Sequence, residues 1–196
     1  MKKIILILTL LLFINSMAQK KNKNNFSISL TGIQPISIGN NFLAKGYEKS
    51  PAFALSMQYN SDSDIFIGLE YQNISKANVN SYWLGNFKYA TSQNYILFGG
   101  YFHLLNEKIY LEHRLGIGIT EIVHEGGLSR YKIDGKRFLI GSKLNYKLNE
   151  TFVAFSQLDF VYSYYDIEIS GPEKSFYSTG LQLMPAVGIR VNFASF

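Results

Sequence analysis

The sequence predicts an all-β protein, a single closed eight-stranded antiparallel up-and-down transmembrane β-barrel. Three observations predict it. Apolar residues alternate with polar or small ones in segment after segment, and the connections between these segments alternate between short and long. Tyr (14), Phe (15) and Gly (16) are abundant among the 196 residues, whereas Pro is rare (4). Aromatic residues favour strands, and a period of two indicates a strand with one apolar face.

The N-terminus has the layout of a secretory signal peptide. A basic start precedes an apolar run over residues 4–14, and the small residues Ser16 and Ala18 stand where signal peptidase cleaves. The run is shorter than the ~20 residues of a transmembrane helix, and no stop-transfer pattern supports the alternative of a retained anchor. We therefore expect a leader over residues 1–18 and an outer-membrane barrel domain over residues 19–196.

Composition excludes several kinds of site. The chain has no cysteine, so lipid acylation at an N-terminal Cys, disulfides and thiolate metal sites are excluded. The net charge is +5, and loss of the leader leaves 17 basic against 14 acidic residues, about +3. No basic block or RNA-binding motif is present, so we expect no nucleic-acid partner.

Eight segments of alternating character can be placed along the chain. The apolar rows are clearest at residues 53–59, 65–71, 109–119, 144–148 and 181–193. The expected strands lie near residues 25–34, 52–60, 65–73, 93–105, 109–122, 137–147, 151–165 and 179–193. Short polar turns fall at residues 61–64, 106–108 and 148–150, and long connections at 35–50, 74–92, 123–136 and 166–178. Short periplasmic turns and long outer loops are typical of outer-membrane barrels, with both termini in the periplasm.

Membrane physics favours closure of these strands into a barrel. Hydrocarbon tolerates no unpaired sheet edge, and the strands are long enough for the ~9–11 residues of a tilted crossing. Aromatic residues gather toward strand ends, where interfacial belts are expected. The proposed belts contain Tyr59, Tyr110, Tyr146, Phe152 and Phe193 near the short turns, and Phe53, Tyr71, Phe138, Tyr164 and Tyr165 near the long loops. The alternative is a soluble, lipocalin-like barrel, which the low charged fraction (17% against ~25% for soluble domains) disfavours.

Over essentially the whole mature length, the chain resembles the small outer-membrane barrels of the OmpA-transmembrane-domain and OmpX type. The resemblance rests on the topology, the leader and the terminal segment 187–196. It implies a location in the outer membrane of a Gram-negative cell, contact with outer-membrane lipid and lipopolysaccharide, and insertion by the barrel-assembly machinery. Members commonly end in an aromatic residue preceded by alternating apolar positions. Here that row ends at Phe193, so we expect residues 194–196 to form a short tail.

The resemblance also implies that the polar face lines a narrow interior. Eight strands leave a lumen that side chains just fill, and opposite charges buried there must pair. Two interpretations stay open, a packed salt-bridge core and an ion path or gate, and we favour the packed core. The candidate interior charge network consists of Glu70, Glu112, Arg114, Lys143, Asp159 and Arg190.

The three histidines offer little support for an enzyme. Some barrels of similar outline deacylate or palmitoylate lipid A, and the deacylases place His and Ser two positions apart on one strand face. Neither His103 nor His113 nor His124 has such a serine. His103 and His113 lie toward the periplasmic side, and we expect His124, beside Glu125, to be a solvated loop residue. No cluster has metal-ligand spacing, so we expect no cofactor or metal.

Two classes of function therefore remain. In the first, the barrel is a non-enzymatic scaffold that displays four extracellular loops for surface interaction or envelope integrity. Its candidate contact surface, rich in the aromatic residues that often mark recognition, contains Tyr82, Trp83, Phe87, Lys88 and Tyr89. In the second class, it is an outer-leaflet lipid A-modifying enzyme or a small-solute channel or transporter. The soluble barrel would instead bind a ligand in a lipocalin-like cavity.

Overall fold

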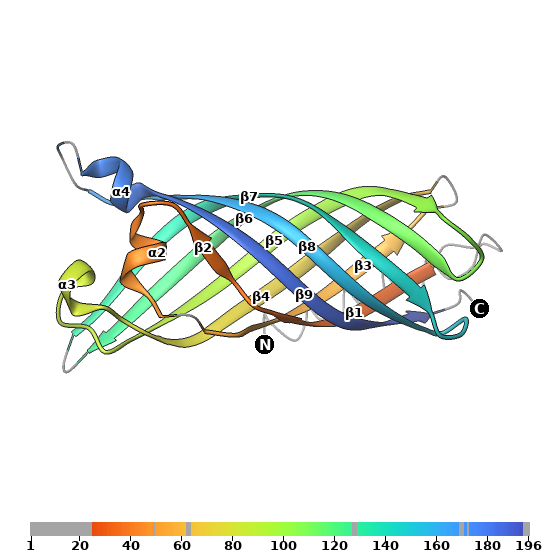
Figure 1. Ribbon diagram of the computed structural model, residues 1–196, viewed down its shortest axis with the longest axis horizontal. Helices are drawn as coiled ribbons and strands as arrows, with labels where there is room; N and C mark the ends of the chain where they lie inside the picture. Colours follow the sequence, from red (N-terminus) through yellow and green to blue (C-terminus); the bar gives the residue numbers. More distant parts are fainter. Residues whose placement is uncertain are drawn as a thin grey trace, which may run out of the picture.

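The computed structural model of the chain is a long, closed barrel of tilted strands (Figure 1). It describes residues 25–48, 50–61, 64–126, 129–168, 171 and 173–193. The expected leader, residues 1–18, and the expected tail, residues 194–196, lie outside the described residues.

Nine strand segments form one antiparallel sheet. They are β1 (Asn25–Ile33), β2 (Ile36–Ile38), β3 (Ala52–Asn60), β4 (Ile65–Asn78), β5 (Tyr89–Leu104), β6 (Ile109–Gly126), β7 (Ser129–Lys147), β8 (Phe152–Tyr165) and β9 (Thr179–Phe193). The sheet closes because β1 pairs with both β3 and β9. β1 pairs with residues 186–193 of β9, and β2 pairs with residues 181–183 of the same strand. Because β1 and β2 together occupy one strand position, the nine segments form an eight-stranded barrel. The predicted eight-stranded antiparallel barrel is confirmed.

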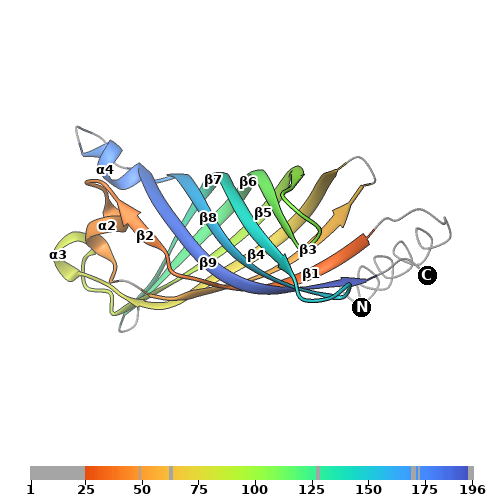
Figure 2. The same cartoon turned by 45° about the vertical axis from the view of Figure 1, so that its right-hand side comes forward.

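The two ends of the barrel differ. Three short helices, α2 (Phe42–Gly46), α3 (Ser81–Leu84) and α4 (Lys174–Ser178), lie at the end that we call the loop end. Tight turns connect the strands at the opposite end, the turn end (Figures 1 and 2). None of the helices in the described part of the chain is long and apolar enough to cross a membrane.

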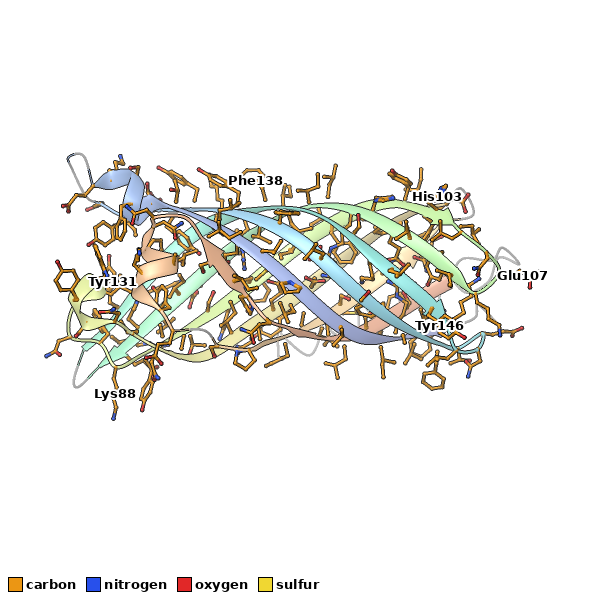
Figure 3. The ribbon with its side chains drawn as sticks, viewed as in Figure 1. Lys88, His103, Glu107, Tyr131, Phe138 and Tyr146 are labelled. Atoms are coloured by element: carbon orange, nitrogen blue, oxygen red, sulfur yellow. The ribbon has the colours of Figure 1, made fainter. Side chains whose placement is uncertain are left out.

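The outer face of the strands is apolar. Leu115 is 63% exposed and Val187 66% exposed, and Phe138 projects away from the barrel wall (Figure 3). Leu30, Ile117 and many other outward side chains are similarly uncovered. An outward apolar band of this kind is the surface that hydrocarbon solvates in a transmembrane barrel.

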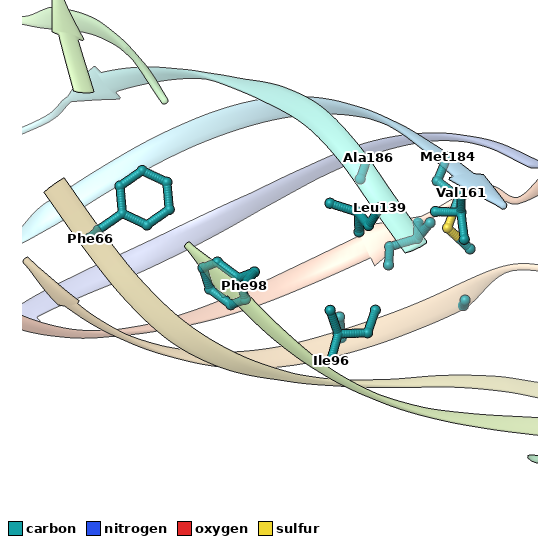
Figure 4. Close-up of a cluster of buried hydrophobic side chains, with 10 residues drawn as sticks. Phe66, Ile96, Phe98, Leu139, Val161, Met184 and Ala186 are labelled. Carbon is teal, nitrogen blue, oxygen red and sulfur yellow. The ribbon is translucent and has the colours of Figure 1, made fainter. Parts of the chain in front are cut away.

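The inner face alternates with this band, and its side chains are buried. One buried apolar cluster fills part of the lumen (Figure 4). Its members include Phe66, Ile96, Phe98, Leu139, Val161, Met184 and Ala186. Polar and charged side chains occupy most of the remaining inward positions and are also buried. Apart from a small cavity at the loop end, side chains therefore fill the described lumen, as expected for eight strands.

Several strands run further toward the loop end than predicted. The connection predicted over residues 123–136 is wrong as a loop, because β6 and β7 stay paired up to Gly126 and Ser129. Likewise β4 extends to Asn78 and β5 begins at Tyr89, which shortens the connection predicted over residues 74–92. Between the apolar band and the loop end, the outer face of β6 and β7 carries charged residues. Apolar and polar residues therefore no longer alternate in the sequence there, although the two strands remain paired.

The strand predicted near residues 25–34 is confirmed as β1, and the connection predicted over residues 35–50 contains one further short strand. The ladder with β3 stops at Ile33, and β2 resumes at Ile36 with β9 as its partner. The assignment of two aromatic residues to the interfacial belts is wrong. Tyr110 and Tyr165 are buried and point inward, since they share a face with Glu112 and Ser163 respectively.

Candidate functional site

All six residues of the candidate interior charge network are buried inside the barrel, and they meet in two ion-pair centres. In the first, the guanidinium of Arg114 on β6 donates from Nη1 to Glu70 Oε2 on β4 at 2.9 Å. Its Nη2 donates to Asp159 Oδ2 on β8, also at 2.9 Å. Charge-assisted bonds of this geometry are strong, and this centre links strands on different sides of the lumen.

The second centre is built around Glu112 on β6. Arg190 on β9 donates to both of its carboxylate oxygens, and Lys143 Nζ lies 4.0 Å from Oε2. Lys143 also sits 4.3 Å from the centroid of the Phe155 ring, a cation–π distance. These contacts correspond to a packed salt-bridge core across the lumen.

Arg137 is a further buried cation, which the candidate network omitted. Its guanidinium donates to Gln72 Oε1 at 3.3 Å, to Gln182 Oε1 at 2.8 Å and to Met184 Sδ at 3.8 Å. Among the described residues it has no carboxylate within ion-pair distance. The sequence could have indicated its burial, since Arg137 lies on the same inward face of β7 as Lys143.

A cap closes the loop end of the barrel. Phe42 and Leu43 of α2 are buried against inward-facing residues of β5 to β8, among them Ile122 and Tyr165. Below α2 a cavity of about 110 Å³ remains, and Gln182 is part of its lining. The short helix is thus held by apolar packing in the mouth of the barrel.

His124 belongs to this cap, so its prediction as a solvated loop residue is wrong. It is 1% exposed, and its Nε2 shares a 2.7 Å hydrogen bond with the Tyr47 hydroxyl. The imidazole also packs against the rings of Phe87 and Tyr131. His124 lies beyond the apolar band, and burial lowers its pKa, while burial raises the pKa of Tyr47. Tyr47 and His124 are 77 residues apart in the sequence. Local sequence patterns therefore gave no sign that His124 is buried.

The other two histidines lie toward the turn end. His103 is exposed near the end of β5 (Figure 3). His113 Nδ1 is 2.9 Å from Ser142 Oγ, and its ring packs against Tyr101. This serine comes from the neighbouring strand, and among the described residues no carboxylate is hydrogen-bonded to His113 to complete a triad of the hydrolase kind. The described chain also contains no group of three or more His, Asp or Glu residues that is arranged to hold a metal ion.

The candidate contact surface lies at the loop end, but its residues differ in exposure. Tyr82 on α3 is 83% exposed, and Lys88 projects outward (Figure 3). Trp83 and Phe87 are half-buried, against Phe176 and His124 respectively. Tyr89, predicted in a loop, is the first residue of β5. The structure therefore divides the five residues between exposed positions and packed ones.

Comparisons with known proteins show similarity in fold alone. No protein-family model matches the sequence, and no curated protein sequence matches it either. Among solved structures, Neisserial surface protein A is similar with a TM-score of 0.64 at 12% identity, covering 86% of this chain and 97% of that one.

Two further structures lie in the same range. OprG from Pseudomonas aeruginosa has a TM-score of 0.57 at 13% identity, with coverage of 88% of this chain and 97% of that one. Ail, the attachment invasion locus protein of Yersinia pestis, has a TM-score of 0.56 at 14% identity, with coverage of 87% and 99%. The chain therefore has the fold of the small eight-stranded outer-membrane β-barrels.

Proposed function

We propose that this protein is a non-enzymatic scaffold of the bacterial outer membrane whose loop end faces outward and attaches to external ligands. In this proposal residues 1–18 direct export, the barrel-assembly machinery inserts residues 19–196, and outer-membrane lipid and lipopolysaccharide surround the apolar band. One similar structure, Ail, is that of a protein named for attachment and invasion, which is compatible with this role.

The observation that carries the proposal is the contrast between the lumen and the loop end. Arg114 and Arg190 form ion pairs across the lumen, and the buried apolar cluster around Phe98 fills part of the lumen. A solute path would require these buried pairs to break, at a cost of about 3–5 kcal/mol each. The loop end instead offers exposed aromatic residues, which often supply binding energy.

The alternatives have weaker support. A lipid A-modifying enzyme needs a catalytic pair near the outer leaflet, and the histidine at the loop end, His124, is buried against aromatic rings. A soluble lipocalin-like barrel would turn its apolar face inward, whereas here the apolar face is the outer one.

The proposal is tested in cells that carry the full-length chain and lack other adhesins. We expect the protein in the outer-membrane fraction, with faster gel migration before heating and with protease cleavage from outside at the loop end. Cells that carry the chain should attach to a surface coated with the external ligand. Cells that carry the variant Tyr82→Ser should attach about fivefold less. The matched control is Tyr146→Ser, since Tyr146 is also exposed but lies at the turn end (Figure 3).

Planar-bilayer recordings on the purified barrel supply the second arm of the experiment. We expect no stable conductance, because the lumen is packed. Steady ion or solute flux together with attachment that Tyr82→Ser leaves unchanged would overturn the proposal in favour of a channel.

A further inference from the structure

A cleft at the loop end combines aromatic rings with an uncharged or acidic rim. It has a volume of about 440 Å³ and lies between α3, α4 and the segment that precedes α2. Its aromatic wall consists of Trp83, Phe176 and Tyr177, all half-buried. Its rim carries exposed polar groups, among them the amide of Asn40 and the carboxylate of Glu173.

The aromatic wall is held in place before any ligand arrives. The rings of Trp83 and Phe176 have centroids 5.1 Å apart, and those of Phe176 and Tyr177 are 4.7 Å apart. The Tyr177 hydroxyl donates to the backbone carbonyl of Trp83 at 3.2 Å, which ties α4 to α3. Tyr177 also packs on Phe42, a fully buried residue of the cap. A preorganised site loses less entropy on binding.

The chemistry of the cleft fits a particular kind of ligand. A pyranose sugar presents an apolar C–H face, which packs on aromatic rings, and hydroxyl groups at its edge, which need acceptors and donors. Glu173 makes no capping hydrogen bond to α4, so its carboxylate is available as an acceptor, and Asn40 can both donate and accept. No lysine or arginine belongs to the lining, and a carboxylate repels anions.

We propose that this cleft is a saccharide-binding site that recognises neutral sugar residues of an external glycan. The inference deepens the proposed attachment function and rests on the loop end facing outward. Sulfated glycans and the phosphorylated core of lipopolysaccharide are disfavoured, because the carboxylate of Glu173 is the only charged group among the described residues that line the cleft. An acyl chain would need a continuous apolar trough, which the polar rim interrupts.

Trp83 is the single tryptophan of the chain and lies in the cleft, so its fluorescence reports occupancy directly. The full mature chain is refolded in an amine-oxide detergent, because maltoside and glucoside detergents carry sugar headgroups. It is titrated with neutral trisaccharides built from glucose, galactose, mannose and N-acetylglucosamine. A parallel titration uses sucrose octasulfate and the deacylated core oligosaccharide of lipopolysaccharide.

We expect saturable changes in Trp83 emission with at least one neutral trisaccharide and none with the anionic probes. Phe176→Leu and Glu173→Gln should each weaken binding about fivefold. Tyr131→Ser is the control, since Tyr131 is an exposed aromatic residue of the same end that packs on Phe87 and His124 instead. Heat-modifiable migration verifies that each variant retains its barrel.

Two outcomes would overturn the inference, namely no response to any neutral sugar or a preference for the anionic probes. Loss of sugar binding would leave the attachment function standing if cells still attach in a manner that depends on Tyr82. Loss of both sugar binding and attachment would remove the proposed function together with the inference.

Discussion

Arg114 is the residue whose loss should disturb the barrel interior most. Replacing it with methionine leaves Glu70 and Asp159 buried without a cation, since both carboxylates bind this one guanidinium. Breaking a buried pair by removing one partner costs about 3–5 kcal/mol. Because two carboxylates lose their partner together, we expect a loss near 5 kcal/mol for Arg114→Met, a large fraction of the ~5–15 kcal/mol that stabilises a typical domain.

Arg137→Met is the matched control, because it removes a cation of equal size and burial. Arg137 bonds only to neutral partners, so its loss leaves no buried charge unpaired. Its removal also ends the cost of burying a cation without a carboxylate. We therefore expect the free energy of unfolding to change by less than about 1 kcal/mol.

The assay is urea unfolding of the refolded chain in lipid vesicles, followed by the fraction that migrates as the fast, unheated form. Trp83 fluorescence suits this purpose less well, because Trp83 lies at the loop end and reports the loops. In the triple variant Arg114→Met, Glu70→Gln and Asp159→Asn, stability should return to within about 2 kcal/mol of the parent, since this ion-pair centre then holds no unpaired charge. Equal losses for Arg114→Met and Arg137→Met, or no recovery in the triple variant, would refute the ion-pair account.

Three further predictions concern the wall and the cap. Leu115→Arg, in the middle of the apolar band, should cost about 2–4 kcal/mol in lipid vesicles, whereas Tyr131→Arg at the loop end should cost about 0–1; equal costs would contradict the assigned band. Gly100→Ala should reduce refolding yield, because a Cβ there meets the carbonyl oxygen of His113, while Gly32→Ala has 3.9 Å of clearance and should refold normally. Burial lowers the pKa of His124, so the unfolded cap binds more protons and cap stability should fall as pH drops through about 6.5; hydrogen exchange of α2 that is unchanged between pH 7.5 and 5 would disprove it.

The sequence predicted the turn end of the barrel well, because the two faces of a strand differ most where one of them meets lipid. The strands Ala52–Asn60 and Thr179–Phe193 begin and end as expected. Phe193, 46% exposed beside Phe26, is the last described residue of the outward row. The inward position of the charged residues follows from the same alternation.

The loop end was predicted less well for physical reasons. Outside the apolar band, Lys132 pairs with Glu121 and Asp134 on the outer face, so both faces of β6 and β7 carry polar residues and the period of two disappears. Near β1, Pro35 has no N–H to donate to a ladder, and β2 resumes only with β9 as its partner. These features depend on surroundings that a hydrophobic pattern does not encode.

The interior charges also specify how the strands align. A slip of one residue turns every side chain of a strand to the opposite face. On β6 such a slip would move Glu112 and Arg114 into lipid and bring Leu115 into the lumen, and each charge near the midplane would cost up to about 2–4 kcal/mol. Since Arg114 binds residues of β4 and β8 at once, a slip would also break pairs on two other strands. The ion-pair core therefore selects a single strand register.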